Sequence, residues 1–295
     1  MDWLREFPQI EPRTLREMAR TVDGHYRTFS RAWGDTIEAA FRPLMDLLLW
    51  LEALLIATPW WLVLAVLCLI VWLASKSRAV TAGTAAAFLL IGLFGLWADT
   101  MRTLAIILVC TLAAVALGLP TGVAMSRSAT LRRVLNPVLD VMQTMPSFVY
   151  LIPIVMLLGI GIVPGIIVVV IYAMPPVIRL TDLGLRLVDK EVLEAADAFG
   201  TRPWRKLWEV ELPLALPTIM AGVNQTIMMA LAMVVVASLI GVRGLGQPVL
   251  QAITNQYFTQ GLLNGLAIVA IAIVFDRTSQ AAARRLQRHR GPAND

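Results

Sequence analysis

The chain has 295 residues, of which 58% are hydrophobic and 15% charged, with a formal net charge of +5 and a mean hydropathy of +0.73. Soluble domains average about 45–50% apolar and about 25% charged residues, so this composition excludes an ordinary soluble protein. It predicts an all-α protein that crosses a membrane several times through helices of about 20 apolar residues each. We expect no nucleic-acid partner.

Residues 1–58 combine a polar tail with a short apolar segment at 44–57. This segment would be about 20 Å long as a helix and contains Asp46 and Glu52, so it is too short and too charged for an ordinary span. We predict an interfacial or half-inserted helix there, followed by a bend at Pro59. The alternative is an eighth span with the N-terminus inside the cell.

Uncharged runs predict about seven membrane-spanning helices, because a charged side chain at the bilayer centre costs roughly 2.5–3.5 kcal/mol. The run at 141–178 is too long for one crossing, and the glycines around Pro164 predict a turn within it. The predicted spans are 59–74, 80–97, 103–125, 138–158, 164–181, 214–240 and 261–276. The predicted regions are an N-terminal part (1–58), two peripheral spans (59–98), a core (99–281) and a basic tail (282–295).

Basic residues orient the predicted spans. Sixteen lie in the loops and the tail on one side, whereas the opposite loops hold only Arg102 and Arg243. Cytoplasmic loops carry the excess of Lys and Arg, so we expect the C-terminus in the cytoplasm. With seven spans, the N-terminus would lie outside.

The loop at 182–213 is longer than a connector between spans needs, and its pattern predicts two short helices. The first helix, at 189–199, would place Val192, Ala196 and Phe199 on one face. Gly200 follows where a left-handed residue commonly ends a helix.

The second helix of this loop would be capped by Thr201 and carry Pro203 in its first turn, and Leu212-Pro213 would end it. Its apolar face would present Trp204, Leu207 and Trp208. Periodicity alone leaves two interpretations open. The hairpin either docks a protein partner or lies on lipid headgroups.

One stretch of this loop resembles a known signature. It reads Glu194-Ala-Ala-Asp-Ala-Phe-Gly200, then nine further residues, and then Val210-Glu-Leu-Pro213. It is the EAAxxxG…IxLP loop of permease subunits of binding-protein-dependent ABC importers, with Val in place of Ile. The segments 143–153, 173–180, 216–225 and 244–247 resemble permeases of the glycine betaine, proline betaine and choline uptake systems.

The resemblance implies a type I ABC importer permease fold in the bacterial inner membrane, with the loop at 182–213 as the coupling loop. The implied partners are a second copy of the chain, a cytoplasmic ATPase dimer that binds ATP and Mg²⁺, a separate periplasmic solute-binding protein and membrane lipid. The implied substrate is a quaternary ammonium osmoprotectant. The candidate ATPase-coupling residues are Glu194, Ala195, Ala196, Phe199, Gly200, Trp204, Leu207, Leu212 and Pro213.

A quaternary ammonium group has no N–H to donate, so aromatic faces suit it better than hydrogen-bond acceptors. Polar groups within spans usually face the bundle interior. The candidate residues of a translocation path are therefore Gln143, Thr144, Ser147, Phe148, Tyr150, Asn224 and Gln225. For Asn224 and Gln225 the alternative is that they only cross-link helices.

Three observations limit the chemistry of this chain. It has no GxxxxGK[ST] phosphate loop, so we expect no enzyme activity and no bound cofactor. Its two cysteines lie in apolar runs and its two histidines in polar tails, so we expect no metal site. An ion-gradient-driven transporter or channel is the rival class, but none of the seven predicted spans has an acid or a histidine near its centre.

Overall fold

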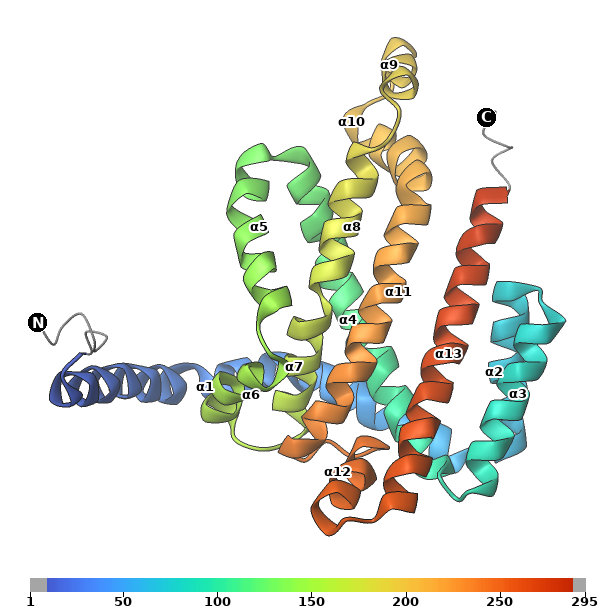
Figure 1. Ribbon diagram of the computed structural model, residues 1–295. Coiled ribbons are helices and arrows are strands. Elements are labelled where there is room, and N and C mark those ends of the chain that lie inside the picture. Colours follow the sequence, from blue (N-terminus) through green and yellow to red (C-terminus); the bar gives the residue numbers. More distant parts are fainter. Residues whose placement is uncertain (1–9, 289–295) are drawn as a thin grey trace, which may run out of the picture.

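The computed structural model describes residues 10–288, with side chains to residue 282, and this part of the chain is helical without strands (Figure 1). The helices are α1 (Pro12–Ala57), α2 (Trp60–Ser75), α3 (Arg78–Leu93), α4 (Trp97–Arg127), α5 (Ala129–Thr144), α6 (Ser147–Leu158), α7 (Ile162–Ala173), α8 (Pro175–Arg186), α9 (Lys190–Ala198), α10 (Pro203–Lys206), η2 (Leu207–Glu211), α11 (Leu212–Ala237), η3 (Ser238–Ile240), α12 (Gly246–Asn255) and α13 (Phe258–Arg288). Part of the predicted basic tail (282–295) lies outside the described residues.

Four helical segments are long and apolar enough to cross a bilayer. They are Trp97–Arg127, Ile162–Arg186, Pro203–Ile240 and Phe258–Ala282. The bent pairs α1–α2 and α5–α6 would raise the number to six, and α3 is a shorter apolar helix. Five of the predicted spans lie mainly on one helix each, whereas 138–158 and 164–181 are each divided between two helices. The predicted number of seven is not confirmed.

The span predicted at 138–158 is broken. Helices α5 and α6 meet at an angle of 102° around Pro146. Met145 is extended, with ψ of 130°, because the ring of a following proline disfavours the helical conformation. As a result α5 runs along the bundle, whereas α6 lies across its lower part in the view of Figure 1.

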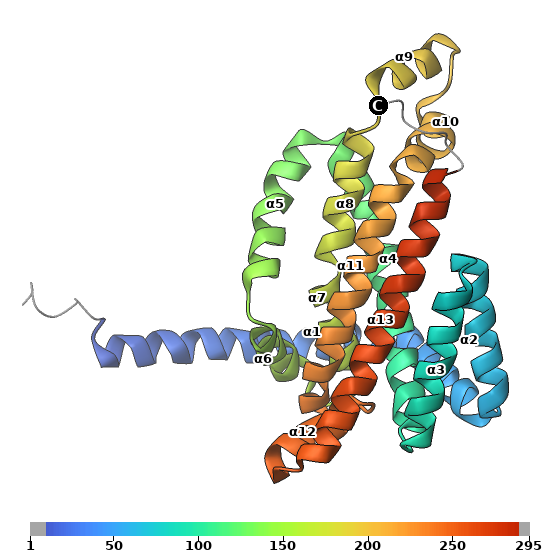
Figure 2. The same ribbon diagram turned by 45° about the vertical axis from the view of Figure 1, so that its right-hand side comes forward.

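The N-terminal helix is far longer than the predicted one. It begins at Pro12 rather than near residue 44, and it runs crosswise to the other long helices (Figures 1 and 2). The bend expected at Pro59 is confirmed, since α1 and α2 meet at 115°. The first part of α1 contains no long uncharged run, because its apolar residues recur every three or four positions among charged ones.

The tightest packing joins α4, α8 and α11, which we call the three-helix core. Gly122 of α4 lies so close to α8 that a Cβ atom would come 2.6 Å from the carbonyl oxygen of Ile178. On α11, a Cβ at Gly222 would come 2.9 Å from Cβ of Leu180. These glycines allow close backbone approach, which is how helices commonly associate in membranes.

Candidate functional site

The coupling loop (182–213) projects from one end of the bundle, at the top of Figures 1 and 2. The predicted first helix is confirmed as α9, and the carboxylate of Asp189 caps it by accepting from the backbone N–H of Glu191 at 3.0 Å. Gly200 has φ of +71°, the left-handed conformation expected there. Its N–H bonds the carbonyl of Asp197, and the N–H of Thr201 bonds that of Ala196, so a Schellman motif ends α9.

The second helix of the loop differs from the prediction in two respects. Thr201 is not its cap, because Arg202 occupies the N-cap position without a side-chain cap bond and Pro203 begins α10. Nor does the helix end at Leu212-Pro213. It continues from Pro203 through the π-helical turn η2 into α11 and reaches Ile240. We attribute this continuity to the wide π turn, which accommodates Pro213 in the first turn of α11.

The outer surface of the loop exposes several of the predicted coupling residues. Phe199 is 91% exposed and Trp204 is 70% exposed, and both line a groove of about 690 Å³ with Gly200, Arg202 and Arg205 among its walls. Glu194 and Ala195 are also exposed, whereas Ala196 and Leu207 are buried and Leu212 and Pro213 are half-buried. The exposed residues offer an apolar and basic surface to a partner, and the buried ones hold the loop together.

Ion pairs attach this loop to the bundle. Within the loop, Lys206 contacts the carboxylate of Asp197 at 2.6 Å and so joins α10 to α9. Glu211, whose side chain is only 5% exposed, accepts a hydrogen bond from Arg127 at the end of α4. The sequence alone does not single out Glu211 or Arg127, because both stand among charged residues of polar segments and only the fold brings them together.

A second buried carboxylate, Asp182 of α8, lies beside this attachment. Its oxygens lie 3.1 Å from Arg186 and 3.8 Å from Arg132 of α5.

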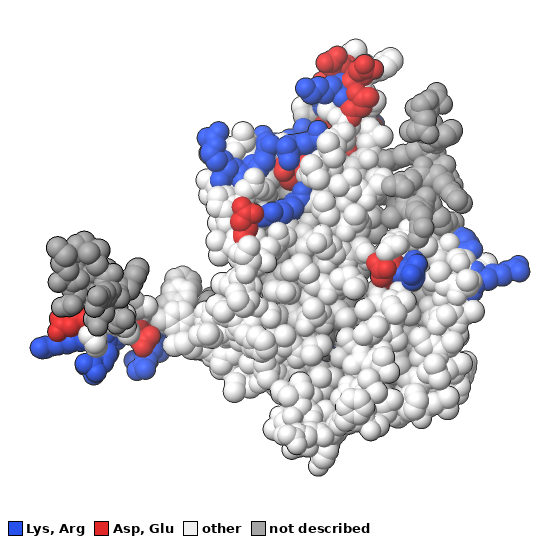
Figure 3. Space-filling view, viewed as in Figure 1, with Lys and Arg blue, Asp and Glu red and all other residues white. Residues whose placement is uncertain are grey.

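Figure 3 shows that charged side chains gather mainly at the coupling-loop end of the molecule and along the projecting part of α1, with a largely uncharged surface between. That distribution is typical of a protein whose middle faces lipid.

The candidate path residues of α5 and α6 lie around the bend between these helices. Gln143, Thr144 and Phe148 are exposed, and Ser147 is half-buried. Tyr150 is buried, and its hydroxyl donates to the carbonyl of Met142 across the bend. Its ring also contacts that of Tyr172, with centroids 5.6 Å apart. Tyr150 therefore holds the bend together in this chain.

The two candidates on α11 have different surroundings. Asn224 donates to Asp276 of α13 at 3.0 Å and accepts from Ser279 at 2.5 Å, so it cross-links α11 to α13 as the alternative interpretation expected. Gln225 is exposed, and its side chain has no hydrogen-bond partner among the described residues. Of the two amides, only Asn224 is held by hydrogen bonds to a neighbouring helix among the described residues.

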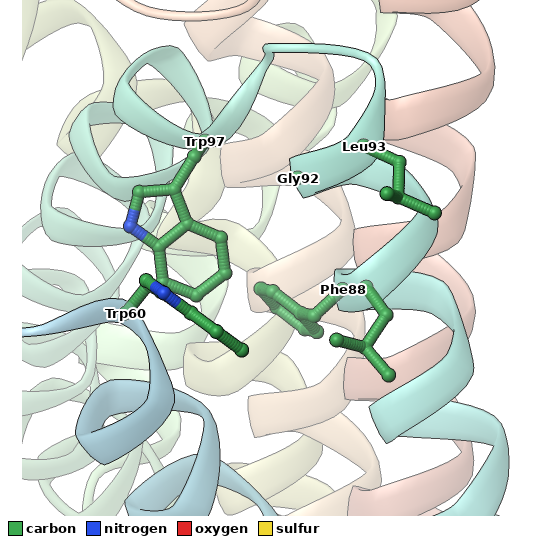
Figure 4. Close-up of a pocket in the computed structure, with 6 residues that line it drawn as sticks. Trp60, Phe88, Gly92, Leu93 and Trp97 are labelled. Atoms are coloured by element: carbon green, nitrogen blue, oxygen red, sulfur yellow. The ribbon is translucent and has the colours of Figure 1, made fainter.

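An apolar pocket of about 410 Å³ lies between α2, α3 and the start of α4, away from the coupling loop (Figure 4). Trp60, Phe88, Gly92, Leu93 and Trp97 are among its walls, and the rings of Phe88 and Trp97 meet edge to face at 6.4 Å. Trp60 begins the first apolar helix after the bend. The pocket is lined almost entirely by carbon atoms, and Trp side chains such as Trp60 and Trp97 are common at the edge of a membrane.

The family profile described as "Binding-protein-dependent transport system inner membrane component" matches residues 114–289, which include the coupling loop and all the path candidates. The chain belongs to this family. The predicted permease fold and its place in a membrane are thereby confirmed, and the ion-gradient-driven transporter is disfavoured.

Several curated relatives of this family are similar to the chain. The glycine betaine/carnitine transport permease protein GbuB of Listeria monocytogenes is 51% identical over 193 residues, which are 65% of this chain and 68% of the relative. The glycine betaine/proline betaine permease ProW of Escherichia coli is 46% identical over 79% of this chain and 66% of its own length. The alignments thus span about two thirds of these relatives.

Solved structures support the fold. A chain of the inward-facing methionine ABC transporter MetNI superposes with a TM-score of 0.57 at 22% identity, and the match covers 62% of this chain and 92% of that one. At this identity the likeness concerns the fold alone. It agrees with an all-helical type I importer permease fold.

Proposed function

We propose that this permease takes up glycine betaine, proline betaine or choline and is driven by ATP hydrolysis in a separate ATPase dimer. The names of the similar permeases, which mention glycine betaine, carnitine and proline betaine, support a quaternary ammonium substrate. The observation that carries the mechanism is the continuity of the coupling loop with α11, because a push on the loop needs a rigid connection to reach the bundle.

The coupling contact is proposed on the exposed surface around Gly200. Phe199 and Trp204 would enter a groove of the ATPase, with Glu194 pairing with a basic side chain there. Exposed aromatic residues are common anchors of protein interfaces, and the family match supports this choice over a headgroup contact. When the ATPase subunits close, α10, η2 and α11 would move together, since they form one helix.

The remaining partners follow from the same assignment. A second copy of the chain would complete the translocation path, and a separate solute-binding protein would deliver the solute at the end of the bundle opposite the coupling loop. The loop end and the C-terminus are proposed to be cytoplasmic, and the basic residues of this end support that orientation. Solute would pass the bend near Gln143, Thr144 and Phe148, and Gln225 of α11 would face it.

The substitution Gly200→Asp tests the coupling contact. A Cβ atom at this position meets no other atom within 4 Å, so a carboxylate has room there and alters the proposed docking surface, but any side chain at a φ of +71° strains the backbone. We expect normal amounts of the protein in the membrane, loss of nearly all ATP-dependent uptake and weaker association with the ATPase. Gly200→Asn is the matched control, because Asn tolerates a positive φ and carries no charge. Wild-type uptake by Gly200→Asp would refute the assignment.

A further inference from the structure

The first half of α1 is outside the region that the family profile covers, and it extends beyond the rest of the bundle (Figures 1 and 2). Helix α1 meets the apolar helix α2 at 115°, which is close to a right angle. Helices that span a bilayer tilt on average about 20° from its normal. Because α2 runs in the direction in which the bundle crosses the bilayer, α1 lies nearly parallel to the membrane plane.

The projecting half of α1 carries an apolar stripe that no other described residue covers. Leu15, Met18, Val22 and Trp33 recur at helical spacing, and their exposed fractions run from 53% to 65%. Further along α1, Leu48 is buried in the core at 2% exposure. The same helix thus begins outside the bundle and ends inside it.

Charged residues occupy the other side of this half. Residues 10–33 contain five arginines and three acids, and helical geometry places Arg13, Arg20 and Arg31 opposite the stripe. Arginines on the polar face and Trp, Phe or Leu on the apolar face are typical of helices that lie in the headgroup region of a bilayer. The long arginine side chains can reach phosphate groups while the stripe contacts acyl chains.

Contacts with α6 fix α1 at this level of the bundle. The hydroxyl of Tyr26 donates to the carbonyl of Pro153, and that of Ser30 donates to the carbonyl of Leu157 at 3.0 Å. Leu157 is in the last turn of α6, where carbonyl groups have no partner within the helix. Gly34 lets the two backbones approach, because a Cβ there would lie 3.3 Å from the Leu157 oxygen. Helix α1 thus supplies a hydrogen-bond donor to a carbonyl group in the last turn of α6 and holds this end of α6 in place.

We propose that the projecting half of α1, residues 12–33, docks on the lipid headgroup layer at the end of the bundle opposite the coupling loop. Three observations carry this inference together. Helix α1 runs nearly in the membrane plane, its apolar stripe with Trp33 is uncovered, and its opposite face is rich in arginine. Its consequence is that the membrane surface supports α6, which begins at the bend of the candidate path. The inference depends on the membrane location of the protein and not on its substrate.

Paired labels on the two faces of α1 test the proposal in the full chain. In a Cys68→Ala background, with Cys110 fully buried, an environment-sensitive fluorophore is attached to Met18→Cys or to its opposite-face control Arg20→Cys. A second pair is Val22→Cys with Arg27→Cys. The protein is reconstituted in vesicles of phosphatidylethanolamine and phosphatidylglycerol, and quenching by lipid-borne nitroxide is compared with quenching by iodide.

We expect nitroxide to quench positions 18 and 22 about threefold or more over 20 and 27, and iodide to show the reverse order. Equal access of iodide to both faces would overturn the proposal, because the stripe would then be in water. Shielding of positions 18 and 22 from both quenchers would also overturn it, in favour of a protein partner such as a second copy. Two pairs guard against the failure of one variant to fold.

Discussion

The three-helix core is tightly packed within the chain, whereas the pair α5–α6 leaves much of its apolar surface exposed. In the core, helices α4, α8 and α11 approach through glycines, and Val177 of α8 is fully buried. Helix α5 buries only Leu139 and exposes Val134, Val138 and Val141 along one side. Because the second helix of the coupling loop continues into α11, the loop and the core form one rigid unit. The difference indicates that α5 leaves an apolar side uncovered by the described residues of this chain, whereas the three-helix core is closed.

The largest effect is expected where the core is tightest. Gly122→Leu would force a side chain against the backbone of α8 near Ile178 and separate α4 from α8. We expect a loss of about 3 kcal/mol of stability, seen as a much lower thermal unfolding midpoint in detergent. Gly83→Leu on α3 is the control, since no atom lies within 4 Å of a Cβ there. Equal midpoints for the two variants would show that the core is not tightly packed.

A smaller effect is expected at the link between the loop and α4. Arg127→Ala leaves the buried carboxylate of Glu211 without its charged partner. Breaking a buried pair costs 3–5 kcal/mol, but the Arg127 side chain is 47% exposed, so we expect about 1–2 kcal/mol.

ATP-dependent uptake should fall about tenfold in Arg127→Ala, because α4 would no longer follow the loop. The double variant Arg127→Glu with Glu211→Arg should recover part of this uptake, and the exposed Arg133→Ala should stay near wild type. A loss of uptake in Arg133→Ala as large as in Arg127→Ala would argue against the link.

The smallest effects on stability are expected on α11, where two adjacent amides differ. Asn224→Ala removes the hydrogen bonds to Asp276 and Ser279 and should cost about 1 kcal/mol. Gln225→Ala should leave thermal stability unchanged within about 0.5 kcal/mol and lower uptake, since its side chain is exposed. The opposite order of stability, or unchanged uptake in Gln225→Ala, would remove Gln225 from the proposed path.

The features that the sequence predicts correctly are those with a local signal. Gly200 is predictable because a left-handed residue ends a helix by its own backbone preference, and the structure gives it φ of +71°. The bend at Pro59 follows equally from one residue. The break at Pro146 depends on the same chemistry, but the long apolar run around it favoured a single span.

Features that depend on distant contacts could not be obtained in this way. The pairing of Glu211 with Arg127 joins residues 84 positions apart, and the cross-link from Asn224 to Asp276 joins residues 52 apart. The projecting half of α1 has a clear amphipathic pattern in the sequence, yet a search for uncharged runs passes over it. A search for apolar residues at helical spacing would have found it.

The most direct test of the account is the energy source of uptake. The permease is reconstituted with its ATPase and its solute-binding protein in proteoliposomes, and entry of labelled glycine betaine is measured with ATP or with ion gradients. The account predicts uptake that requires ATP and all three proteins and that persists when ionophores collapse the gradients. Uptake by the permease alone, driven by a sodium or proton gradient, would contradict it.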